Sequence, residues 1–85
     1  MMKILYSPKF SRQYKKLPNE IKDKFEEREP ILRTNPFDSK LKTHKLNGDL
    51  ADCWSFSVDY KIRVIFMFRD ANTISLESVG DHDMY

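Results

Sequence analysis

The sequence predicts an α+β fold: a small four-stranded sheet, formed by an N-terminal strand and a C-terminal antiparallel three-strand meander, with a two-helix hairpin packed on one face. Two features lead to this fold class. The last third of the chain contains three consecutive runs of alternating apolar and polar residues joined by short links, which is typical of an antiparallel meander. The N-terminal half contains two stretches with apolar residues at helical spacing, and these can cover the apolar face of the sheet.

The first two elements are a strand and a helix. A short apolar run at residues 3–6 is the predicted N-terminal strand. Ser7-Pro8 then indicates a helix start, because a serine hydroxyl caps free amide groups and proline suits the first helical position. The helix has a single apolar stripe, made of Phe10, Tyr14 and Leu17.

A second helix is predicted from Asn19 onward, with Ile21 and Phe25 on its buried stripe. Pro30 conflicts with a continuous helix, because an interior proline removes one hydrogen bond and costs about 3 kcal/mol. We therefore expect a kink or an early end near Glu29.

The central run of the meander has two different faces. Strict alternation places five residues on its apolar side: Tyr60, Ile62, Val64, Phe66 and Phe68. The opposite side carries Lys61, Arg63, Ile65, Met67 and Arg69. Because the helices are needed to cover the apolar side, we expect the second side to stay open for function. Before the meander, residues 40–50 are predicted to be a polar, basic connector that ends in a turn at Gly48.

Composition limits the class of protein. The 85 residues are expected to form one domain, residues 1–85, and the one cysteine cannot form an internal disulfide, so a cytoplasmic location is expected. No run approaches the roughly 20 apolar residues of a membrane span. The formal net charge is only +2, but cations gather in residues 1–16 and 33–45. Such a basic patch suggests a polyanionic partner, although it is also compatible with an ordinary solvated surface.

Two histidines are candidate reactive residues. His82 follows the last predicted strand, and His44 lies in the connector, where Lys40, Lys42 and Lys45 can bind a phosphate backbone. An imidazole is suited to proton transfer near neutral pH. For His44 the alternative is a residue in a solvated loop, and for His82 a surface residue near the end of the sequence.

Arg63 adds a permanent cation whose planar fork suits phosphate oxygens, although a salt bridge to Asp59, Glu77 or Asp81 is an equally good explanation. With the two histidines and Tyr85, it suits cleavage of RNA by its own 2′-hydroxyl. That reaction needs a base, an acid and a cation for the crowded phosphate, and it needs no metal or other cofactor.

Several motifs together resemble one protein family over essentially the whole chain. They are Tyr6-Ser-Pro-Lys-Phe10, Leu17-Pro18, Asn35-Pro36, Leu46-Asn-Gly48, Trp54-Ser-Phe56, Asp59-Tyr-Lys-Ile-Arg-Val-Ile-Phe66 and Val79-Gly-Asp-His-Asp-Met-Tyr85. The chain resembles the RelE/ParE superfamily of bacterial toxins from type II toxin–antitoxin systems. The segments around His44 and His82 are most similar to the YafQ branch, whose members are ribosome-dependent messenger RNA endonucleases.

The resemblance implies a function and a set of roles. It implies an mRNA interferase that cuts messenger RNA in the ribosomal decoding site and so inhibits translation. His82 would be the general acid, His44 would contribute to activity, and Arg63 would stabilise the scissile phosphate. Lys61 stands where the family often has arginine, and it would bind substrate together with Tyr85.

The resemblance also implies a partner, a cognate antitoxin that wraps and blocks the toxin. We expect the free protein to be a monomer and to form a higher-order complex with the antitoxin. Two other functions stay open on the sequence alone. One is a ParE-like inhibitor of DNA gyrase without nuclease activity, and the other is a degenerate toxin that binds its antitoxin and RNA without catalysis. The superfamily fold hosts different functions, so fold alone does not choose between them.

Overall fold

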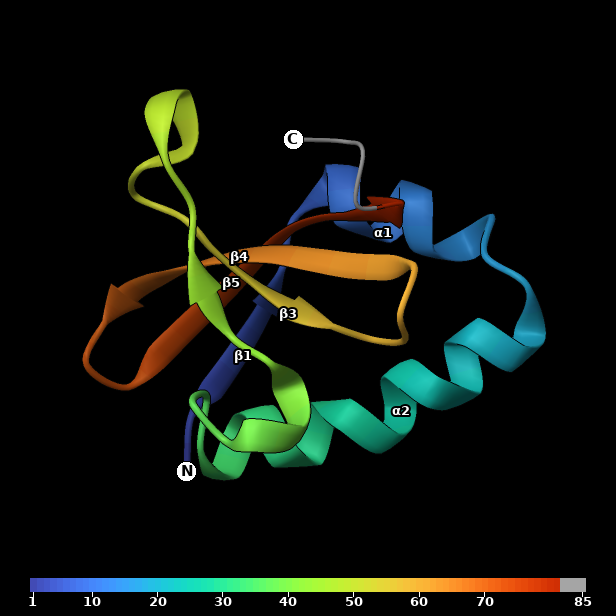
Figure 1. The fold of residues 1–85 in the computed structure, drawn as a ribbon, viewed down its shortest axis with the longest axis horizontal. Coiled ribbons are helices and arrows are strands. Elements are labelled where there is room, and N and C mark those ends of the chain that lie inside the picture. Colours follow the sequence, from blue (N-terminus) through green and yellow to red (C-terminus); the bar gives the residue numbers. More distant parts are fainter. Residues whose placement is uncertain (82–85) are drawn as a thin grey trace.

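The computed structural model describes residues 1–81 and contains one mixed sheet with two helices (Figure 1). The five strands lie in the order β1-β5-β4-β3-β2. Their bounds are Lys3–Tyr6 for β1, His44–Lys45 for β2, Trp54–Ser57 for β3, Ile62–Asp70 for β4 and Thr73–Asp81 for β5. β1 pairs in parallel with β5, and the other neighbours are antiparallel. The predicted α+β class, N-terminal strand and meander are therefore confirmed.

The sheet has one more strand than the four predicted. The additional strand, β2, contains only His44 and Lys45, which pair with Ser55 and Trp54 of β3. The backbone N–H of Leu46 extends this pairing by donating to the carbonyl of Cys53, at 3.0 Å. Two residues are too few to show an alternating pattern, so the strand exists because the edge of β3 offers it hydrogen bonds.

Both helices pack on the same side of the sheet. α1 covers Pro8–Lys15 and α2 covers Asn19–Thr34, and two 3₁₀ turns follow, η1 at Ser39–Leu41 and η2 at Gly48–Leu50. The predicted cap is present, because the backbone N–H of Phe10 donates to Ser7 Oγ at 3.0 Å. Side chains of the helices and the sheet form one core, which includes Phe10, Phe25, Leu32, Phe56, Val64, Phe66, Ile74 and Leu76.

The expected break of α2 near Glu29 was wrong. The helix continues through Pro30 to Thr34. Leu32, in the last turn of the helix, is completely buried, and Ile31 packs against the core. Thr34 Oγ1 also donates to the carbonyl of Pro30 at 3.0 Å. Tertiary packing of the last turn therefore outweighs the cost of one interior proline.

A β-bulge changes the alternation of β5. Ile65 of β4 lies opposite Ser78, whereas Phe66 lies opposite Leu76, so Glu77 is an extra residue in β5. As a result Leu76 and Val79 both point into the core. They are three positions apart, and in a regular strand residues at this spacing would point to opposite faces.

The side of the sheet predicted for Tyr60 was also wrong. Tyr60 is 83% exposed, because it lies in the turn between β3 and β4 and not in the strand. The backbone N–H of Val58 donates to the carbonyl of Ile62 at 2.9 Å and closes this turn. From Ile62 to Phe68 the predicted alternation is confirmed on the core side.

α1 completes the edge of β5 where β1 ends. β1 pairs with β5 only as far as Tyr6 and Leu76. Beyond that point Ser7 Oγ donates to the carbonyl of Glu77 at 2.9 Å, and the N–H of Val79 donates to Gln13 Oε1 at 2.8 Å. These contacts hold α1 beside β5 and bring some of its side chains to the face of the sheet opposite the core.

Candidate functional site

The face of the sheet opposite the core, here called the open face, is built on small polar side chains. Its floor contains four buried serines, Ser55, Ser57, Ser75 and Ser78, from β3 and β5. These serines are covered by neighbouring side chains and lie outside the hydrophobic core cluster. Small polar side chains offer little apolar surface, so this side of the sheet is not built to pack against another layer of the protein.

Two rows of residues cross the open face. The first row runs from β2 to β5 through paired residues: His44, Ser55, Ile65 and Ser78. In the second row Ser57 lies opposite Arg63, and Arg63 lies opposite Gly80. The rows are two residues apart along each strand, which is about 7 Å. The strand pairing thus places the predicted residues His44 and Arg63 on one face, in neighbouring rows.

His44 lies against the sheet at the start of the first row. Its ring nitrogens are 3.3 Å and 3.5 Å from Ser55 Oγ, and Nδ1 is 3.4 Å from the carbonyl oxygen of Lys42. The side chain is nevertheless exposed. An exposed imidazole whose ring is oriented by a hydroxyl and a carbonyl can accept or donate a proton at a defined place.

Arg63 is half-buried, and its guanidinium is anchored to the turn before β4. Nη1 donates to the carbonyl oxygen of Asp59 at 2.6 Å. Within residues 1–81 the ion pairs are Arg33 with Glu29 and Arg69 with Glu77, so the alternative of a salt bridge from Arg63 to Asp59 or Glu77 is not found. One edge of the guanidinium is therefore held by backbone, which fixes the position of the positive charge.

The carboxylate of Asp59 organises the same turn. It accepts the backbone N–H of Lys61 at 2.8 Å and that of Ile62 at 2.6 Å. Burial acts to raise the pKa of Asp59, but the hydrogen bonds from Ile62 and Lys61, with the nearby charges of Lys24 and Arg63, outweigh it and lower the pKa below its usual value. Asp59 thus stays ionised and keeps the turn closed.

The predicted substrate-binding lysines are not all on one face. Lys42 precedes β2 in a left-handed conformation with φ of 51°, and it is exposed beside His44. Lys45 lies opposite Trp54 on the core side of the sheet, where its ammonium sits 5.6 Å from the centre of the indole ring. Lys40 is exposed in η1, and Lys61 is exposed in the turn before β4. The backbone of Lys42 therefore lies close to the His44 ring, and the Lys45 side chain lies on the opposite side of the sheet from His44.

Two predicted residues, His82 and Tyr85, lie outside the described residues. The last described residue, Asp81, pairs with Ile62. The roles predicted for His82 and Tyr85 stay predictions. Among residues 1–81, no group of three or more histidine, cysteine, aspartate or glutamate side chains is arranged to hold a metal ion. No helix of this part of the chain is long and apolar enough to cross a membrane.

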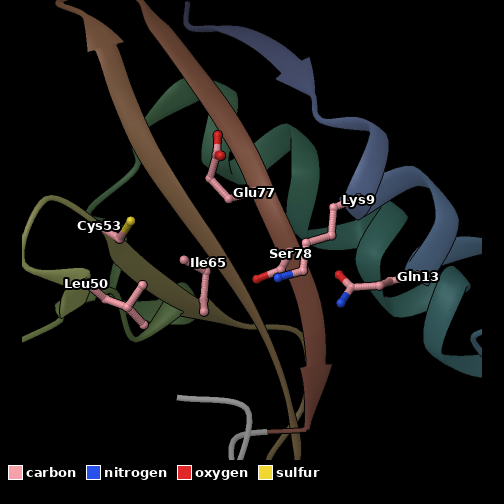
Figure 2. A pocket seen from close by; sticks show the side chains of 7 residues that line it. All are labelled: Lys9, Gln13, Leu50, Cys53, Ile65, Glu77 and Ser78. Carbon is pink, nitrogen blue, oxygen red and sulfur yellow. The ribbon is translucent and has the colours of Figure 1, made fainter.

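α1 contributes to the open face, which was not predicted from the sequence. Lys9 and Gln13 of this helix border a hollow on the open face together with Ser78 and Cys53 (Figure 2). Lys9 was recognised only as one of several cations near the start of the chain. The spacing of Lys9 and Gln13, one helical turn apart, is a signal that both share one face of α1.

Comparison with known proteins adds the fold family. No family model matches the chain, and no curated protein matches it. Several solved structures are similar over nearly the whole chain. YafQ from E. coli strain BL21(DE3) has a TM-score of 0.80 and 20% identity, over 98% of this chain and 96% of that one. The YoeB/ParE toxin from Agrobacterium tumefaciens has a TM-score of 0.79 and 17% identity, over 95% of this chain and 99% of that one. The chain has the RelE/ParE toxin fold.

Another similar structure contains a toxin together with its antitoxin. The heterotetrameric YoeB–YefM toxin–antitoxin complex from Staphylococcus aureus gives a TM-score of 0.77 and 22% identity, over 96% of this chain and 98% of that one. The fold expected from the sequence motifs, including its YafQ-like form, is confirmed by these similarities. These similarities concern the fold, and one fold can host different functions.

Proposed function

We propose that the protein is the toxin of a type II toxin–antitoxin system and an endoribonuclease that cuts messenger RNA on the ribosome. The observation that carries the proposal is the open face, where His44 and Arg63 lie in neighbouring rows above a floor of serines. An imidazole and a fixed guanidinium on one face, in the RelE/ParE toxin fold, supply two of the three groups that cleavage by the 2′-hydroxyl requires, a base and a cation.

The geometry allows one RNA segment to reach both groups. His44 and Arg63 are two strands apart and two residues apart along the strands, so their backbones are separated by roughly 12 Å. Both side chains extend from this floor, so the RNA backbone between them can contact the imidazole at one end and the guanidinium at the other. This span fits a short stretch of single strand.

Each group has a role in the proposed reaction. His44 takes the proton of the 2′-hydroxyl, and Arg63 stabilises the charge that develops on the phosphate. His82 donates a proton to the departing 5′-oxygen, as the sequence predicts. Lys42, Lys61 and the other predicted lysines bind the RNA backbone, and Tyr85 stacks on a base. The reaction uses protein side chains alone.

An antitoxin is the proposed partner. The similarity to the toxin of the YoeB–YefM complex supports an antitoxin that binds this fold. We propose that the antitoxin is encoded with the toxin, that the free toxin is a monomer, and that the two form a higher-order complex in the cytoplasm.

A cell-free translation experiment tests the proposal. The purified protein is added to translating ribosomes, and the messenger RNA ends are mapped by primer extension. We expect discrete cuts inside codons, insensitive to a metal chelator, and no cut where the scissile nucleotide carries 2′-deoxyribose. The His82→Gln variant should lose cleavage but keep its fold. Intact RNA together with broken DNA would instead support a gyrase inhibitor, and cleavage of the 2′-deoxy substrate would exclude the 2′-hydroxyl mechanism.

A further inference from the structure

A hollow of about 280 Å³ lies on the open face between α1 and η2 (Figure 2). Its floor is formed by Ile65 and Ser78, which are neighbours across β4 and β5. Lys9 borders it on the α1 side, and Leu50 and Cys53 border it on the η2 side. Its volume is at the lower end of ligand pockets, which suits a single ring system and not a large ligand.

Lys9 brings a positive charge into this hollow. Figure 2 shows its side chain extending from α1 across β5 toward Ser78. Within residues 1–81 neither ion pair involves Lys9. Its helix contains no acidic residue, and Arg12 and Lys15 add further positive charge. The ammonium of Lys9 is therefore available to an anionic group that enters the hollow.

Glu77 lines the same hollow but does not cancel the charge of Lys9. Its carboxylate accepts the hydroxyl of Ser75 at 2.5 Å and lies 3.5 Å from the guanidinium of Arg69. The negative charge of Glu77 is thus countered by other groups. The hollow keeps a net attraction for anions at its α1 side.

The rest of the hollow combines apolar and polar surface. Ile65 is only 5% exposed and forms an apolar floor. Leu50 of η2 lines the hollow on the other side. Gln13 uses its carbonyl oxygen to accept the N–H of Val79, so its amide nitrogen can still donate to a ligand. An apolar floor with hydrogen-bonding groups at its rim is suited to a nucleobase, which has apolar faces and polar edges.

We propose that this hollow holds one nucleotide of the messenger RNA strand, with its base between Ile65 and Leu50 and its phosphate on Lys9. The inference rests on the proposed function, because the bound strand is the one cut beside His44. Ile65 and Ser78 belong to the same row of the sheet as His44, so a strand that crosses the open face along this row enters the hollow. This continuity with His44, together with the positive charge of Lys9, favours RNA over a segment of a protein partner.

The one cysteine of the chain makes the hollow directly observable. Cys53 lines it and is half-buried, so a bound nucleotide should shield its thiol from alkylation. Burial raises the pKa of the Cys53 thiol, so alkylation is followed at mildly alkaline pH. The ligand is a ribosome programmed with messenger RNA whose decoding-site codon carries 2′-O-methyl groups, which cannot be cut. Co-sedimentation measures binding in the same samples.

We expect the programmed ribosome to slow alkylation of Cys53 several-fold in the wild type. The Lys9→Gln variant should lose most of this protection. The Lys16→Gln variant is the matched control, because it removes the same charge just after the same helix and does not line the hollow. It should protect Cys53 as well as the wild type does.

Several outcomes would overturn the inference. Binding without protection of Cys53, or equal loss of protection in Lys9→Gln and Lys16→Gln, would show that the hollow holds no nucleotide. Equal protection by vacant ribosomes would assign it to ribosomal RNA, and protection by the antitoxin alone would assign it to a protein segment. These results are distinguishable from failure of the proposed function, which would appear as unbound ribosomes and uncut messenger RNA.

Discussion

His44 and Ser55 lie opposite one another across the β2–β3 ladder, with His44 Nε2 3.3 Å from the Ser55 hydroxyl. Ser55 is fully buried, whereas His44 is exposed. A rigid residue of the sheet thus orients a side chain that solvent and ligands can reach. Because β2 has only two residues, this side-chain contact and the ladder itself together decide where the imidazole points.

The first prediction concerns proton transfer by His44. His44→Gln should lower the rate of RNA cleavage by about 10²–10⁴-fold, the usual contribution of a positioned proton-transfer group. Its stability should change by no more than about 0.5 kcal/mol, because the side chain is exposed. Single-turnover cleavage and urea unfolding measure the two effects. A wild-type rate would remove His44 from the proposed mechanism.

Ser55→Ala provides the companion measurement. Loss of one orienting hydrogen bond is worth about 0.5–1.5 kcal/mol, so cleavage should fall by roughly two- to tenfold. In the His44→Gln background the same change should have no further effect, because the group that Ser55 orients is already absent. An equal loss in both backgrounds would mean that Ser55 acts independently of His44.

The second prediction separates charge from geometry at Arg63. Arg63→Lys keeps the positive charge but loses the planar fork that contacts the carbonyl of Asp59, so this variant should cut RNA slowly. Arg63→Ala loses both the charge and the fork, so it should hardly cut RNA. Both variants should lose about 1.5–3 kcal/mol at most from the missing charged hydrogen bond, measured by urea unfolding. If the alanine variant loses stability but keeps wild-type cleavage, Arg63 only supports the turn.

The third prediction ranks the connector lysines. Lys40, Lys42 and Lys45 were all predicted from the sequence to bind RNA. The backbone carbonyl of Lys42 contacts the His44 ring, whereas the Lys45 ammonium lies over Trp54 on the other side of the sheet. Lys42→Gln should reduce the slope of log affinity against log salt by about 0.7, the effect of one lost phosphate contact on single-stranded RNA. Lys45→Gln should change this slope less. Equal changes would show that RNA reaches both faces.

The fourth prediction is the acid sensitivity of the β3–β4 turn. The pKa of Asp59 is lowered from its usual value of 3.8, because the hydrogen bonds of the turn and nearby cations outweigh the opposing effect of burial. A carboxyl group whose pKa is lower in the folded than in the unfolded protein stabilises the fold fully when the pH is above its unfolded-state pKa. This stabilisation is lost as the pH falls through the folded-state pKa. Asp59 should therefore contribute to stability above about pH 4 and lose this contribution in stronger acid.

Asp59→Asn is the test, because it keeps the acceptor oxygen and removes the charge. The variant should unfold at lower urea than the wild type at pH 7, and the difference should shrink as the pH falls below about 4. The pKa of Glu29 is also lowered, despite the opposing effect of burial, by its hydrogen bonds with Arg33 and Tyr6, so some acid sensitivity should persist in the variant. A constant difference between the two proteins across this range would exclude the predicted linkage.

Much of the fold could be predicted from local patterns. The helix cap at Ser7, the turn at Gly48 and the core side of β4 follow from residue chemistry and alternation, and all are present. The errors have a common physical origin. Packing of Leu32 keeps α2 helical past Pro30, and pairing with β3 creates the two-residue strand β2.

The candidate site was predictable only in part. Alternation correctly places Arg63 opposite the core, and the sequence alone identifies His44 as a candidate. It does not show that His44 and Lys45 point to opposite sides, because their strand was not recognised. Lys9 reaches the open face only because α1 docks along β5, and no local pattern contains that docking.

The Gln13 side chain has a consequence for behaviour in solution. An exposed strand edge is a template for pairing with another chain, and long apolar edges promote aggregation. Where β1 ends, Gln13 accepts the N–H of Val79 and so fills a position that a neighbouring strand would use. A single side-chain amide thus occupies a hydrogen-bonding position on β5 through which another chain could otherwise add to the sheet.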